Sequence, residues 1–140
     1  MTVKNSTAIR NTLKAYERLK REQHIDTLFR TGKAYSFFPV KFIYTMVPRS
    51  AAETSPVLAG FSVPKKKFRK SVQRHRIARL MREAWRLNKH SLYAAVPPNM
   101  QLHVFLVHTG TEMPEFATIQ EVVIKGIAAL QETAAKQTLS

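Results

Sequence analysis

Lysine and arginine are concentrated in one short stretch of this sequence, residues 65–90. That stretch holds eleven basic side chains and one acidic side chain, whereas residues 1–64 hold ten and four, and residues 91–140 hold two and four. The formal net charge of the whole chain is +14, which is more than solubility requires. A local excess of this kind is typical of a surface that binds a polyanion, so we expect a nucleic-acid partner.

The periodicity of residues 71–92 predicts that many of these charges share one helix face. Ile77, Leu80, Met81 and Ala84 recur at helical spacing and define an apolar face. Basic side chains at six positions from Arg74 to Lys89 fall within roughly 140° of one another on the other side. The predicted nucleic-acid contacts are Lys65, Lys66, Lys67, Arg69, Lys70, Arg74, His75, Arg76, Arg79, Arg82, Arg86 and Lys89. Arginine suits this role because its guanidinium binds phosphate oxygens in a bidentate manner and stays charged near neutral pH.

A charge run can also do no more than solvate a helix face. Runs of that kind usually mix the two signs, whereas Glu83 is the single acid among residues 65–90. Unrelieved repulsion within such a run would destabilise the fold, so its presence favours a binding role.

Catalytic groups are much less evident than binding groups. The nine acids are scattered, with no pair spaced to grip two metal ions, and the chain contains no cysteine. His103 and His108 stand an odd number of residues apart on one expected strand, so a regular strand would point them to opposite faces. We therefore predict no catalytic residue and no metal ligand in the protein.

The expected elements describe a single α+β domain. Helical patterns at 6–19 and 20–31 precede strands at 34–38, 40–47 and 57–63; then come the helix at 71–92, a strand at 102–108 and a helix from 114. At 140 residues and 44% hydrophobic composition, one packed core is expected. No apolar run approaches the ~18 residues of a membrane helix and no secretory signal is seen, so a cytoplasmic location is expected.

Several motifs within this pattern resemble the bacterial ribonuclease P protein subunit. They are GFSV at 60–63 followed by two lysines, SVQRHRIARLMRE at 71–83, RLK at 18–20 and IDTLFRTG at 25–32. The family carries an arginine-rich helix signature of the form R-N-R-I-K-R-x-x-R-E after a strand and a lysine pair. The likeness covers residues 18–134. We expect residues 18–136 to form the RNA-binding domain, after an N-terminal extension at 1–17 that is helical or disordered and before a frayed tail at 137–140.

The sequence departs from the family pattern at two positions of that helix and in the preceding loop. His75 stands where the family usually has Asn, and Ala78 stands where it usually has Lys or Arg. The basic stretch between Lys66 and Ser71 is one residue longer than usual. The arginines of the motif remain in place.

The resemblance implies a protein that assists a large catalytic RNA in removing the 5′ leader of precursor tRNA. Chemistry is then expected on the RNA, with Mg²⁺ at the RNA active site, no cofactor held by the protein alone and no protein partner required. The family's leader cleft between the sheet and the first helix maps onto Ile25, Phe29, Lys41, Phe42 and Tyr44. The implied fold is an α/β sandwich, ribosomal-protein-like, of order α-β(β)β-α-β-α with a left-handed βαβ crossover.

Two other functions remain open at this point. A ribosomal or RNA-chaperone-type binding protein would show the same basic helix, and a self-sufficient metal-dependent nuclease would need a metal site that the sequence does not indicate.

Overall fold

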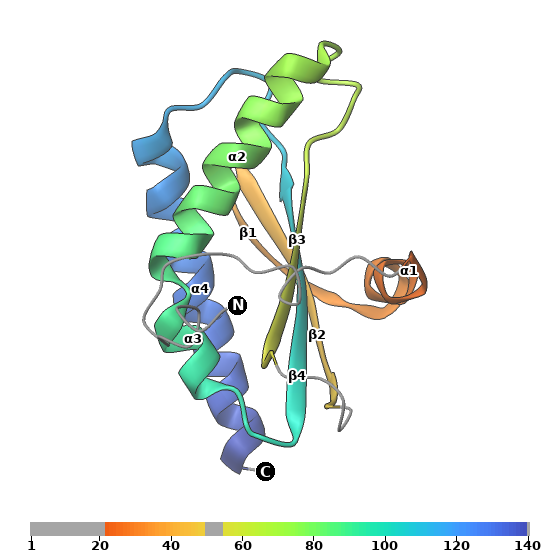
Figure 1. The fold of residues 1–140 in the computed structure, drawn as a ribbon, viewed down its shortest axis with the longest axis vertical. Helices are drawn as coiled ribbons and strands as arrows, with labels where there is room; N and C mark the ends of the chain where they lie inside the picture. The colour runs from red at the N-terminus through yellow and green to blue at the C-terminus, as the bar shows by residue number, and fades with distance from the viewer. Residues whose placement is uncertain (1–21, 50–54, 140) are drawn as a thin grey trace, which may run out of the picture.

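The computed structural model describes residues 22–49 and 55–139 (Figure 1). The helix expected at 6–19 and the extension at 1–17 lie outside these residues. In chain order the elements are α1 (Glu22–Thr31), β1 (Lys33–Phe37), β2 (Val40–Pro48), β3 (Val57–Ser62), α2 (Ser71–Asn88), α3 (His90–Ala95), β4 (Met100–His108) and α4 (Phe116–Leu139). The predicted α+β class is confirmed.

One four-stranded sheet of order β1-β2-β4-β3 organises the fold. The pairs β1–β2 and β2–β4 are antiparallel, while β3 and β4 are parallel neighbours. Because parallel neighbours need a crossover connection, the chain between them forms α2 and α3. The hand of this crossover stays a prediction.

The two faces of the sheet carry different helices (Figure 1). In Figure 1, α2, α3 and α4 lie on one side of the sheet, and α1 lies on the other. Strand residues alternate between the faces, so Val104 and Leu106 of β4 join the large core under α2 and α4. Phe105 and Val107 join a smaller cluster with Leu28 of α1.

Helix α2 is fixed to the sheet by a stripe of large side chains. Ile77, Met81, Ala84 and Trp85 are buried, and Leu80 is only half-buried. Trp85 lies one helical turn beyond Met81 and is the largest buried side chain of the molecule's described part. The other face of α2 therefore keeps a fixed orientation toward solvent.

Two helices differ in extent from the sequence expectation. The predicted helix 71–92 ends at Asn88, and α3 begins at His90 after Lys89 as a separate helix. Helix α4 runs to Leu139, into the segment where a frayed tail was expected. Gly126 lets α4 approach the sheet closely, since a Cβ there would overlap the ring of Phe42.

Candidate nucleic-acid interface

The loop after β3 and the first turns of α2 present a continuous group of exposed basic side chains. We call this group the basic surface, and its members are Lys65, Lys66, Lys67, Arg69, Lys70, His75, Arg76 and Arg79. The ion pairs found within residues 22–49 and 55–139 involve other side chains, so no described carboxylate neutralises this surface. Its charge is thus available to a ligand.

Arg74 has a different position from the one expected. Its Nη1 donates to the carbonyl oxygens of Phe68 and Arg69, both at 2.8 Å, so the guanidinium turns back onto the loop. Phe68 is buried, and Nζ of Lys67 donates to the carbonyl of Thr109 at 2.6 Å. These contacts fix the loop to the start of α2 and to the end of β4.

The C-terminal half of α2 contributes less charge to the surface than predicted. Arg86 pairs with Glu83, and this contact holds the pKa of the Glu83 carboxyl below its ordinary value. The prediction for Lys89 is wrong: its side chain is only 3% exposed, with Nζ 5.3 Å from the Tyr93 ring centroid. Lys89 keeps helical backbone dihedrals between α2 and α3, and its side chain is buried next to Tyr93 of α3. Arg82 is half-buried, so its exposure lies between that of the basic surface and that of Lys89.

A second candidate surface lies on the face of the sheet covered by α1. Phe29 is 49% exposed, and its ring meets that of Phe105 edge-on at a centroid distance of 5.3 Å. The Phe105 ring rests over Gly60, where any Cβ would overlap it. Ile25 packs against the same cluster, and Lys41 is exposed on this side of β2. The structure therefore brings Ile25, Phe29 and Lys41 to one face.

Phe42 and Tyr44 do not belong to that surface, so their assignment to the leader cleft is wrong. Both belong to the large core on the opposite face, with 0% and 7% exposure. The Tyr44 ring stacks on Tyr35 at 5.0 Å, and Tyr35 is hydrogen bonded to Thr133 of α4. The aromatic that replaces them on the α1 face is Phe105, which alternation along β4 could have indicated once the buried face was known.

The two strand histidines occupy opposite faces, as predicted. His103 is hydrogen bonded to Gln101 at 2.8 Å, while the His108 ring lies 5.6 Å from that of Phe68. His108 is fully buried with neither ring nitrogen bonded, and burial together with the nearby Lys67 charge lowers its pKa. Within the described residues, no three histidines or carboxylates come close enough to hold a metal ion.

No described helix is long and apolar enough to cross a membrane.

Comparison with known proteins identifies the family of this chain. The family model described as Ribonuclease P matches residues 13–131. The ribonuclease P protein component of Porphyromonas gingivalis (strain ATCC 33277) is 38% identical over 114 residues, covering 79% of this chain and 80% of that protein. The protein component of Chlorobium phaeobacteroides is 30% identical over 122 residues, covering 81% and 84%.

Solved structures show the same fold. The Staphylococcus aureus RNase P protein aligns with a TM-score of 0.62 and 19% identity, covering 84% of this chain and 98% of that one. The RNase P protein from Thermotoga maritima aligns with a TM-score of 0.56, also at 19% identity, covering 81% and 96%. With a family match over most of its length and relatives above 30% identity, this chain belongs to the ribonuclease P protein family.

Proposed function

We propose that this protein binds the catalytic RNA of ribonuclease P through the basic surface and assists removal of the 5′ leader from precursor tRNA. The observation that carries the proposal is the arrangement of exposed cations on residues 65–79, fixed to the core and unpaired with described acids. Membership of the family supplies the identity of the RNA.

The rigidity of the basic surface supports binding to a folded RNA. Each phosphate neutralised by a lysine or arginine releases condensed counterions, so affinity depends steeply on salt concentration. Because Arg74 and Lys67 hold the loop by hydrogen bonds to main-chain oxygens, the loop loses little conformational freedom on binding.

The α1 face supports a role in binding the single-stranded leader. Phe29 offers half of its surface to solvent, and Lys41 adds a positive charge on the same side of the sheet. Stacking of an unpaired base on an aromatic ring contributes about 1–3 kcal/mol and tolerates any base. Such a surface would hold leaders of differing sequence.

Hydrolysis itself is assigned to the RNA. Within the proposal, Mg²⁺ is held by RNA phosphates at the cleaved bond, and the protein positions substrate and RNA without a protein partner. Two metal ions held by oxygen ligands about 3.5–4 Å apart are a common arrangement for phosphodiester cleavage.

Reconstitution tests the proposal. Purified protein, the catalytic RNA from the same organism and precursor tRNA are combined at low magnesium, and cleavage is compared with each component alone. We expect the protein to raise RNA-dependent cleavage and to be inactive by itself. Cleavage by protein alone would indicate a nuclease, and RNA binding without stimulation would indicate a ribosomal or chaperone-type protein.

A further inference from the structure

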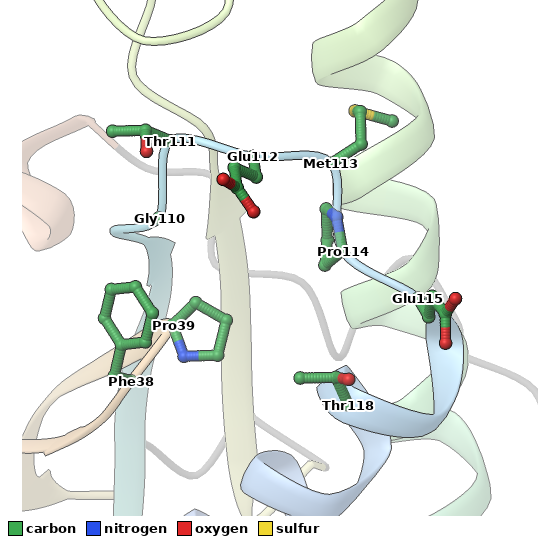
Figure 2. A pocket seen from close by; sticks show the side chains of 9 residues that line it. All are labelled: Phe38, Pro39, Gly110, Thr111, Glu112, Met113, Pro114, Glu115 and Thr118. Atoms are coloured by element: carbon green, nitrogen blue, oxygen red, sulfur yellow. The ribbon is translucent and has the colours of Figure 1, made fainter.

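A pocket of about 530 Å³ lies between the β1–β2 turn and the segment that leads into α4 (Figure 2). Phe38 and Pro39, from the turn between β1 and β2, form one wall, and the chain from Gly110 to Glu115 arches over it. Thr118 lines it from the first turns of α4. Its volume is within the range of small-molecule sites.

Hydrogen bonds join this pocket to the basic surface. Lys67 donates to the carbonyl of Thr109, and the Thr109 amide donates to the carbonyl of Pro39 at 2.8 Å. Lys67 of the basic surface and Pro39 of the pocket therefore contact the same residue, Thr109.

The exposed ring of Phe38 is the first feature that points to a ligand. It is 75% exposed, the most of any large apolar side chain among the described residues, and it lies at a turn where it packs no core. Burying such a ring against an apolar or aromatic surface is favourable, and an unpaired base supplies that surface.

Charge narrows the choice of ligand. Glu112 and Glu115 are exposed and belong to the pocket, and in Figure 2 the Glu112 carboxylate points into the space in front of Pro39. Two carboxylates repel phosphate but accept hydrogen bonds from the amino groups of bases. The lysines outside the pocket attract the phosphate backbone of an RNA. The interior of the pocket, with its two carboxylates, favours a neutral group that donates hydrogen bonds.

We infer that this pocket binds an unpaired nucleobase with an exocyclic amine, stacked on Phe38 and hydrogen bonded to Glu112. The inference rests on the proposed function, because the base belongs to an RNA held by the basic surface. It adds to that function a base-selective contact, distinct from the sequence-tolerant α1 face.

Cytidine and uridine monophosphates are matched probes, because cytosine carries an exocyclic amine where uracil carries a carbonyl oxygen. Each is titrated at pH 7.5 into the full-length protein labelled with ¹⁵N, and the amide resonances of Gly110, Thr111 and Thr118 are followed. We expect both to shift these resonances, with cytidine monophosphate binding about five-fold more tightly or better. Equal affinities, or unchanged resonances, would overturn the inference.

Two variants separate the stacking contact from the hydrogen bond. Phe38→Ala should weaken both nucleotides about five-fold or more, and Glu112→Ala should remove the preference for cytidine. Ile124→Ala and Glu132→Ala, exposed positions on α4 outside the pocket, are the matched controls and should change neither affinity. Unaltered binding in Phe38→Ala would contradict the assignment.

The alternative ligand for two carboxylates is a basic peptide. A lysine tripeptide that shifts the pocket resonances more strongly than cytidine monophosphate would replace the nucleobase assignment. Reconstituted cleavage is measured on the same preparations. If only the base site is wrong, the protein still stimulates RNA-dependent cleavage. If the proposed function is wrong, the protein does not stimulate cleavage, even where nucleotides shift the pocket resonances.

Discussion

At the scale of single residues, the arginines of α2 divide into two kinds that the sequence alone presents as one. Arg79 is exposed, whereas Arg74 donates two hydrogen bonds to carbonyls of the preceding loop. Under the proposed function, an arginine whose donors point at main-chain oxygens would contribute to RNA binding through the loop that it holds. The two kinds should respond differently to substitution.

Arg74→Lys tests this division because it keeps the charge and removes the Nη1 group that donates to both carbonyls. We expect amide hydrogens of residues 64–70 to exchange faster in the free variant, and affinity for the catalytic RNA to fall about ten-fold or more, because one charge-assisted hydrogen bond contributes about 1.5–3 kcal/mol. Hydrogen exchange by mass spectrometry measures the first effect. Arg79→Lys is the control, and loop exchange as slow as in the wild type in Arg74→Lys would refute a positioning role.

Phe29→Ala tests the α1 face. Removing the half-exposed ring should weaken binding of precursor tRNA by about 1–3 kcal/mol through lost base stacking. Mature tRNA without a leader should bind the reconstituted enzyme equally well with either protein, which separates leader contact from general damage. Equal losses for both RNAs would show that Phe29 acts by supporting Phe105 instead.

At the scale of elements, the sequence was sufficient where periodicity is strong. Apart from the separate helix α3, the order of strands and helices of the described residues followed from spacing, and so did the apolar face of α2, where Ile77, Met81 and Ala84 are buried. The face that a β2 residue occupies did not follow. Alternation separates Phe42 and Tyr44 from Ile43, but it does not say which of the two faces is covered by α4 and which by α1.

Lys89 shows a second limit of periodic patterns. A helix wheel gives the direction of a side chain but not what covers it, and Lys89 is buried next to Tyr93 of the following helix. Arg74 shows a third, because spacing gives the direction of a side chain but not the carbonyl that it meets in a neighbouring loop.

Contact between α4 and the sheet depends on Gly126, which leads to a prediction about stability. In Gly126→Ala the new methyl would overlap the Phe42 ring, which is fully buried in the core. Overpacking of this kind costs about 1–3 kcal/mol, and it should outweigh the better helix propensity of alanine. Urea denaturation should show a lower free energy of unfolding.

The partner substitution Phe42→Leu provides the matching control for Gly126→Ala. It makes room beside residue 126, so the double variant should be more stable than the sum of the two single effects predicts. Strictly additive losses would mean that the close approach of α4 to β2 is not what requires glycine.

At the scale of the whole molecule, the basic surface and the buried side chain of His108 lie at the same end of the sheet. The basic surface repels itself in the absence of RNA, and His108 lies buried beneath its loop, in ring contact with Phe68 and near Lys67. Protonation of His108 would add a buried charge with no hydrogen-bond partner among the described residues, at the place where positive charge is already greatest. The folded protein therefore resists this protonation more than the unfolded chain does.

The consequence is a defined pH dependence of stability. Above the ordinary His pKa of 6.5, His108 is neutral in both states and contributes no slope; as pH falls below 6.5, the unfolded chain takes up the proton first and the free energy of unfolding decreases. His108→Leu removes this proton uptake while filling the same buried position. Denaturation of both proteins at pH 7.5 and pH 5 should show the wild type losing more stability than the variant, whereas parallel losses would mean that His108 is protonated equally in both states.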